Sequence, residues 1–376
     1  MGNWRAILTV GLLFMATASC SGRSSGVAVS TPATDQTASG NTGTTAVPAT
    51  TLVPQVWDRI TAPANCLCSD GSGFHFYIHR ADPTKVMFFL EGGGACFDIT
   101  TCGPASNSFR RVIDHPDDLS DASQGIFDFT DPRNPFKDWS VVYLPYCTGD
   151  VHLGNTTHDY GSGVVIHHNG YVNASTVLSA LSQFFPNTEQ LMVVGESAGS
   201  VAAPLYAGMA RDLLPNARIT VLADGSGAYP DIPAINTLIG TVWGTVDAIP
   251  SWPENRGQTL ASWSIPGLFV QAHRHAPAIV FARHDYAFDS TQSLFAALAG
   301  IPADNLVALI DRNEQQIEAV GMQLFSFISP GDRHTVLQHP DFYTETVNGS
   351  SLLRWVSDLV AGTVVADVHC TDCKNG

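Results

Sequence analysis

The chain has 376 residues, of which 34 are acidic and 18 basic, so its formal net charge is −16 at pH 7. This balance excludes a protein that binds nucleic acid through bulk electrostatics, since such binding needs clustered Lys and Arg. Only 14% of the residues are charged and 44% are hydrophobic, and 33 Gly and 22 Pro predict many turns, which excludes a coiled coil or a disordered acidic tail.

Residues 1–20 are typical of an export signal. A single basic residue, Arg5, precedes an apolar stretch over residues 6–15, which is too short to remain as a membrane-spanning helix. The four residues that end at Cys20 (TASC) resemble a bacterial lipoprotein box, with Thr in place of the usual Leu. We therefore expect lipid on Cys20, and ordinary cleavage after Ala18 is the alternative.

Residues 21–51 are dominated by Ser, Thr, Gly, Ala and Pro, a composition that predicts a disordered, flexible tether. A tether suits a protein whose start is anchored, so we expect a cell-surface or periplasmic bacterial lipoprotein, and a secreted enzyme is the alternative. From residue 52 the composition changes, and no second linker or internal repeat follows. Residues 52–376 are therefore expected to form one domain, large enough to carry insertions or a cap.

Five short apolar runs predict the strands of a parallel sheet, because strands buried on both faces lack polar alternation. Helical patterns at residues 174–185 and 198–214 lie between some of them. Strand alternating with helix predicts a doubly wound α/β domain with helices on both faces and chemistry at the carboxyl ends of the strands. The five runs are residues 85–90, 139–144, 190–194, 218–223 and 278–282.

Three glycines, Gly92, Gly93 and Gly94, follow the first of these strands. Acyl transfer needs backbone N–H donors for the oxyanion that forms on the substrate, and a glycine-rich loop after a strand can supply them. Gly93 and Gly94 are the expected donors. A phosphate-binding loop would need Lys-Ser or Lys-Thr after the glycines, which is missing, so no nucleotide cofactor is expected.

The third run continues into Gly195-Glu196-Ser197-Ala198-Gly199 and then into a helical pattern. This strand-turn-helix context for G-x-S-x-G is typical of a nucleophile elbow, where a tight turn exposes the serine. Ser197 is thus the expected nucleophile. The amide of Ala198 is expected to complete the oxyanion hole with those of Gly93 and Gly94.

Several histidines and aspartates could be assembled into a metal site, because imidazole and carboxylate are zinc ligands. No H-E-x-x-H or comparable spacing supports this, so no metal is expected. The histidines and aspartates considered for such a site are His152, His158, His167, His168, Asp150 and Asp159.

In an exported protein, disulfides are the simpler interpretation of the cysteines. Cys370 and Cys373 are spaced for a bridge, and a bridge between Cys96 and Cys102 would brace the glycine loop. Cys66, Cys68 and Cys147 remain. If Cys20 carries lipid, the other seven cysteines are odd in number, so at least one thiol should be unpaired within the chain.

Four motifs in order resemble the pectin acetylesterase family, which includes the Notum carboxylesterases. They are LEGGGACFD from residue 90, YCTGDVHLGN from residue 146, GESAGS from residue 195 and LADGSGAY from residue 222. The resemblance extends over residues 56–364 and implies an α/β-hydrolase fold. Ala95 stands where the family usually has Trp, and residues 230–276 match no motif, which leaves substrate choice open.

The resemblance also implies a triad in the order Ser, acid, His. The segment FDSTQ after the last predicted strand resembles the family's acid segment and makes Asp289 the expected acid, with Asp285 as the competitor. Asp224 follows another strand but falls in a stretch that resembles a structural motif of the family. For the base, a strand and turn lead to His334, and His339 is the alternative.

These features predict an exported serine carboxylesterase that hydrolyses O-acetyl or other O-acyl groups, on small molecules or polysaccharide, with no cofactor and no membrane contact beyond the lipid anchor. A lipase-like or Notum-like deacylase of longer acyl chains is one alternative, because the cap-like region 230–276 holds enough apolar residues for an acyl pocket; core packing explains them equally well. A non-catalytic, polysaccharide-binding surface lipoprotein is the other. The acidic surface favours neutral substrates.

Overall fold

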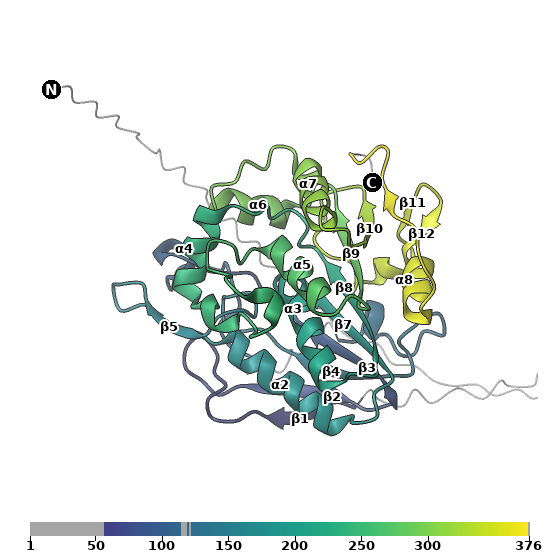
Figure 1. Cartoon of the computed structure of the whole chain (residues 1–376), viewed down its shortest axis with the longest axis horizontal. Coiled ribbons are helices and arrows are strands. Elements are labelled where there is room, and N and C mark those ends of the chain that lie inside the picture. The colour runs from purple at the N-terminus through teal and green to yellow at the C-terminus, as the bar shows by residue number, and fades with distance from the viewer. Residues whose placement is uncertain (1–55, 114–118, 120–121, 375–376) are drawn as a thin grey trace, which may run out of the picture. The chain divides into compact units, whose positions relative to one another are not determined.

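A nine-stranded sheet runs through the part of the chain that the structure describes, residues 56–113, 119 and 122–374 (Figure 1). The predicted signal, Cys20 and the predicted tether lie outside these residues. In the computed structural model the strand order is β1-β2-β4-β3-β7-β8-β9-β10-β13. Strand β2 pairs antiparallel with β1 and β4, and the other neighbours are parallel.

The strands of this sheet are β1 Asp58–Thr61, β2 His75–His79, β3 Asp82–Leu90, β4 Trp139–Leu144, β7 Gln190–Glu196, β8 Arg218–Asp224, β9 Val280–Tyr286, β10 Leu324–Ser329 and β13 Val368–His369. Two small hairpins add β5 Thr156–Asp159 with β6 Val165–His168, and β11 Thr346–Val347 with β12 Ser350–Ser351. The five predicted runs form β3, β4, β7, β8 and β9.

The central strands are buried on both faces, which explains their unbroken apolar sequence. Phe88 and Val193 face one hydrophobic core, and their neighbours Met87 and Val194 face a second core on the other side of the sheet. Helices α2, α3 and α5 pack into the first core and α8 into the second. The predicted α/β-hydrolase class is therefore confirmed: a mostly parallel sheet with helices on both faces.

The helices are α1 Ile99–Cys102, α2 Gly170–Phe184, α3 Ala198–Leu213, α4 Pro233–Trp243, α5 Ile265–His275, α6 Ser290–Leu298, α7 Leu306–Glu318 and α8 Leu352–Ala361, with short 3-10 turns at Gly125–Phe127, Thr245–Ala248, Pro253–Asn255 and Pro340–Tyr343. Within the described residues, no helix has both the length and the apolar character needed to cross a membrane.

Helix α2 begins four residues before the predicted start, because the buried Asp150 carboxylate accepts from the amide of Gly170 and holds the first turn of the helix.

The cap-like region divides into two kinds of structure. Helix α5 packs against α3, and its Phe269 and Ala272 belong to the core. Helix α4 exposes Leu238 to solvent and turns Ile235 and Ile239 into a pocket. The apolar residues predicted for this region therefore serve both as core and as pocket wall.

Three disulfides join described cysteines. The predicted bridges Cys96–Cys102 and Cys370–Cys373 are present, and the third joins Cys68 to Cys147. Cys66 is a buried free thiol. Its pKa is raised by burial, which keeps it in the neutral form.

Candidate active site

Ser197 lies at a sharp turn between β7 and α3. Its backbone has φ 50° and ψ −116°, a conformation that a residue with a side chain rarely adopts. The flanking glycines are required by close packing: a Cβ on Gly195 would collide with the carbonyl of Gly199, and a Cβ on Gly199 with the carbonyl of Leu90. The turn thus presents the serine hydroxyl at the carboxyl edge of the sheet.

A continuous hydrogen-bonded chain joins Ser197 to His334 and Asp289. Ser197 Oγ lies 2.7 Å from His334 Nε2, and His334 Nδ1 lies 2.6 Å from Asp289 Oδ2. Asp289 is fully buried, whereas the His334 side chain is 21% exposed. The structure therefore brings together the three residues that the sequence predicts as nucleophile, base and acid.

The Asp289 carboxylate is held by donors besides His334. Asp289 caps α6, and its Oδ1 accepts from the amides of Thr291 and Gln292 at 2.9 Å each. The Gln292 side chain donates to Oδ2 at 3.1 Å. Hydrogen bonds of this kind stabilise a buried carboxylate in its charged form and fix its orientation.

The competing acid, Asp285, has other partners. It forms an ion pair with the buried Arg283 at 2.9 Å and accepts from the amide of Gly227 and the side chain of Gln292. Burial raises the pKa of Asp285. Its role in the structure is to link the loop after β8 to β9.

Asp224 positions the loop that carries His334. Its Oδ2 accepts from the amides of Val336 and Leu337, and its Oδ1 pairs with His284 at 2.7 Å. Although burial opposes it, the neighbouring His284 and these amides hold the pKa of Asp224 below its usual value. The alternative base, His339, is exposed and precedes the 3-10 turn at Pro340–Tyr343.

The loops that carry Asp289 and His334 are also joined directly. The amide of Phe288 donates to Gly331 O, and the amide of Ser290 donates to Asp332 O. Gly331 in turn donates to the carbonyl of Cys373, in the Cys370–Cys373 disulfide. The C-terminal bridge therefore supports the loop that leads to His334.

The glycine loop presents backbone amides beside Ser197. Gly94 has φ 80°, and a Cβ there would collide with the carbonyl of Ser108, so only glycine fits. The carbonyl of Gly93 accepts from Arg110 N. Among the described residues, the amides of Gly93 and Gly94 donate to no backbone carbonyl. Ala198, at the first position of α3, has no acceptor within its helix.

Sequence reasoning missed the residues that hold this loop. Glu91, directly before the glycines, accepts from the hydroxyl of Tyr143, the amide of Tyr146 and the guanidinium of Arg110. Its carbonyl accepts from His152 Nε2 at 2.9 Å. The sequence did hold a sign of this role, because Glu91 is a charged residue at the end of an otherwise apolar strand.

Three of the four histidines considered as metal ligands, His152, His167 and His168, have side-chain hydrogen bonds within the protein. His168 donates from Nδ1 to the carbonyl of Thr148 and accepts at Nε2 from Tyr160. Asp150 accepts from Thr148 Oγ1 and from the amides of His152 and Gly170. In the described chain His168 also lies beside Cys96 and Cys102, but both sulfurs are in a disulfide.

These buried groups predict acid destabilisation. Burial lowers the pKa values of His152 and His168 to about 4 and raises the pKa of Asp150 to about 6. Between pH 6 and 4 the unfolded chain therefore binds one more proton at each histidine and one fewer at the aspartate. The net difference of one proton should lower the unfolding free energy by about 1.4 kcal/mol per pH unit on acidification.

Denaturant unfolding at pH 6 and pH 5 measures this effect. His168→Gln removes one of the two histidines and should flatten the dependence. Equal stability of the wild-type protein at both pH values would contradict the prediction.

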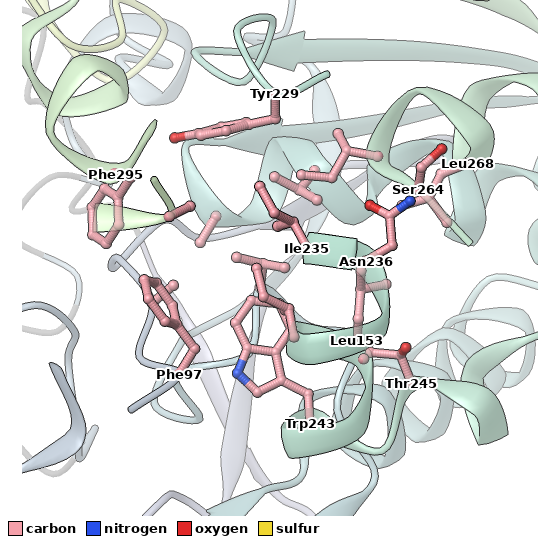
Figure 2. A pocket seen from close by; sticks show the side chains of 18 of the residues that line it. Phe97, Leu153, Tyr229, Ile235, Asn236, Trp243, Thr245, Ser264, Leu268 and Phe295 are labelled. Carbon is pink, nitrogen blue, oxygen red and sulfur yellow. The ribbon is translucent and has the colours of Figure 1, made fainter. Parts of the chain in front are cut away.

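A pocket with a cavity volume of about 130 Å³ opens beside Ser197. Figure 2 shows the side chains that converge on it from several elements. Ala95, the small residue of the glycine loop, is one of its walls. Most of the remaining lining is apolar and includes Phe97, Leu153, Ile235, Ile239, Trp243, Trp263, Leu268 and Phe295.

Solved structures and known sequences resemble this chain. The Wnt deacylase Notum from Drosophila superposes with a TM-score of 0.59 at 18% identity, covering 83% of this chain and 96% of that one, which shows a shared fold. Pectin acetylesterase 5 of Arabidopsis thaliana is 25% identical over 197 residues, 49% of this chain and 44% of that protein. Palmitoleoyl-protein carboxylesterase NOTUM of Mus musculus is 26% identical over 172 residues, 44% of this chain and 34% of that protein.

The matched part of the chain thus spans less than half the length of these two curated relatives. The family model described as Pectinacetylesterase matches residues 50–246, which is more than half of the chain and includes the glycine loop and Ser197. The predicted family is confirmed: the chain belongs to the pectinacetylesterase family.

Proposed function

We propose that this protein is a serine carboxylesterase that hydrolyses O-acyl esters through an acyl-enzyme. The observation that carries the proposal is the hydrogen-bonded chain from buried Asp289 through His334 to Ser197, whose hydroxyl lines the apolar pocket. Membership of the pectinacetylesterase family supports it. The triad chemistry itself requires no metal or organic cofactor.

In the first half of the reaction, Ser197 Oγ attacks the ester carbonyl while His334 Nε2 takes its proton. Asp289 holds the imidazole in the tautomer with Nδ1 protonated and stabilises the imidazolium that forms. His334 then gives its proton to the departing alcohol. The amides of Gly93, Gly94 and Ala198 stabilise the oxyanion, where loss of one donor typically costs about 3 kcal/mol.

In the second half, His334 removes a proton from water, which attacks the acyl-enzyme at the same carbonyl carbon. The second tetrahedral intermediate collapses, the proton returns to Ser197 Oγ, and the carboxylic acid leaves. One ester and one water thus give one acid and one alcohol, with the enzyme unchanged.

Substitution of the two candidate acids should give opposite signatures. Asp289→Asn should lower kcat by about 10⁴-fold, because a neutral amide cannot hold and stabilise the imidazolium. Asp285→Asn should leave kcat of the folded protein near the wild-type value but lower the unfolding free energy by about 3 kcal/mol, since the buried Arg283 loses its nearest carboxylate and keeps only the more distant Glu314 at 3.7 Å.

Steady-state kinetics and thermal unfolding of both variants make this comparison. A large loss of kcat in folded Asp285→Asn, with Asp289→Asn active, would transfer the role of acid to Asp285.

A second candidate is a deacylase of longer acyl chains, which the mostly apolar lining of the pocket favours over an acetylesterase. Each methylene buried in such a pocket stabilises the complex by about 0.8 kcal/mol. With p-nitrophenyl esters from acetate upwards, kcat/KM should therefore rise about fourfold per methylene until the pocket is filled. A maximum at acetate would instead favour the acetylesterase.

Export and anchoring are part of the proposal. The three disulfides support an oxidising compartment, where such bridges persist. Lipid on Cys20, the tether over residues 21–51 and a single catalytic domain over 52–376 rest on the sequence pattern. Mass spectrometry of the mature N-terminus distinguishes a lipidated Cys20 from cleavage after Ala18.

A further inference from the structure

A second Ser–His–Asp chain lies in the interior, apart from the candidate triad. It is formed by Asp224, His284 and Ser329 from the adjacent strands β8, β9 and β10. His284 Nδ1 lies 2.7 Å from Asp224 Oδ1, and His284 Nε2 lies 3.0 Å from Ser329 Oγ. Each of the three residues is 0% exposed. No substrate can reach this serine, so the chain has a role other than nucleophilic attack.

The Asp224 end of this buried chain contacts both sides of the candidate triad. The carbonyl of Asp224 accepts from the amide of Ser197 at 2.7 Å. Its Oδ2 accepts at 2.8 and 2.9 Å from the amides of Val336 and Leu337, two and three residues after His334. Asp224 thus fixes the backbone that carries the nucleophile and the backbone that carries the base.

The backbone is strained at both of these places. Ser197 has φ 50°, and Thr335, directly after His334, has φ 62°, values that residues with a side chain rarely adopt. Such conformations persist where neighbouring contacts hold them. Asp224 supplies a contact at each place, to the amide of Ser197 and to that of Val336. Val336 is fully buried, so without this acceptor its amide would have to move, and the loop with it.

His284 holds the Asp224 carboxylate in the orientation that these contacts require. A carboxylate only accepts hydrogen bonds, so His284 donates to Oδ1 from Nδ1, and Oδ2 is left to face the two loop amides. The carbonyl of His284 also accepts from the amide of Gly225 at 2.9 Å. The backbone of Gly225 packs on the His334 ring, since a Cβ there would lie 3.2 Å from Cε1.

We propose that Asp224 and His284 act as positioning residues for ester hydrolysis. They keep the Ser197 hydroxyl and the His334 ring at hydrogen-bond distance from one another, and neither touches the substrate. The inference rests on the proposed esterase function. A displacement of about 1 Å within an active site can cost about 10²-fold in rate, so loss of this support should lower kcat and leave KM unchanged.

The first test compares His284→Ala with His284→Asn. Alanine removes the donor to Asp224, so kcat for a p-nitrophenyl ester should fall by about 10²-fold at unchanged KM. Asparagine places an N–H donor where histidine has Nδ1, so His284→Asn should keep kcat within about threefold of the wild-type value. Asp285→Asn is the matched control, because Asp285 is the next residue of β9 and is equally buried. It should lose stability and keep kcat.

The second test separates positioning from a purely structural role. Asp224→Ala removes the acceptor of the two loop amides and should lower kcat by about 10²-fold or more. In the His334→Ala background the same change should cause no further loss, because a residue that acts through His334 then has nothing to position. A change that only reduced the folded fraction would lower the activity of both backgrounds by the same factor. Thermal unfolding measures that fraction.

Three results would overturn the inference: wild-type kcat in folded His284→Ala, a His284→Asn variant no faster than the alanine variant, or equal losses from Asp224→Ala in both backgrounds. Should Asp224→Ala fail to fold, His284→Ala takes its place in the His334→Ala background. Absence of ester hydrolysis by the wild-type protein would instead remove the proposed function.

Discussion

Replacement of Ser197 by Ala is expected to lower kcat for ester hydrolysis by about 10⁶-fold, the loss typical of a triad nucleophile. The Ser197 hydroxyl is the group that would bond to the substrate carbonyl, and His334 is its hydrogen-bond partner at 2.7 Å. Alanine occupies the same backbone position without a new clash, so the unfolding free energy should change by less than about 1 kcal/mol. Steady-state kinetics and thermal unfolding measure the two effects.

Labelling with a fluorophosphonate probe adds an independent readout, because the probe reacts with an activated serine. Ser200→Ala is the control within the same motif: Ser200 is buried and donates to the carbonyl of Ser197 at 2.6 Å. It should still be labelled and active. Full activity in Ser197→Ala would remove Ser197 as the nucleophile. No labelling of folded wild-type protein would favour the alternative of a non-catalytic binding protein.

The parts of the fold that were predictable are those where burial leaves a simple pattern. Strands β3, β4, β7, β8 and β9 are buried on both faces and so have apolar runs. Strand β2, with the sequence HFYIH, pairs antiparallel near the sheet edge and contains polar residues, so it gave no such run. Strand β13 has only two residues, too few for any periodicity.

The choice between two acids shows what sequence can and cannot decide. Asp285 and Asp289 both lie near the end of β9, and nothing in their spacing says which one reaches His334. A signal was nevertheless present. Arg283 and Asp285 are two residues apart in a strand and so lie on the same face, where they pair in the structure. That pairing leaves Asp289 for the histidine.

The pocket was the least predictable part of the site. Apolar residues on α4 and near Trp252 look alike in sequence, because periodicity marks a buried face and not what covers it. In the structure Ile235 and Ile239 face the pocket, whereas Trp252 stacks on His275 with ring centroids 4.1 Å apart. To tell the pocket residues from the packed Trp252, one needs the position of α5. That position depends on contacts with α3, which is far away in the sequence.

Replacement of His334 by Ala is expected to lower kcat by about the same 10⁶-fold as loss of the nucleophile, because the serine is a weak nucleophile without its base. The fold should persist, since Asp289 keeps its hydrogen bonds to Thr291 and Gln292. The double variant Ser197→Ala/His334→Ala should be no slower than either single variant, because the residues act as a unit.

The matched control is His339→Ala, which changes an exposed histidine five residues further along the same loop and should retain wild-type kcat. Kinetics of the wild-type protein and the four variants, with circular dichroism to verify folding, complete the comparison. Loss of activity in His339→Ala with retention in His334→Ala would assign the base to His339. Additive losses in the double variant would show that His334 and Ser197 do not act together, and the hydrogen bond between them would then have no part in catalysis.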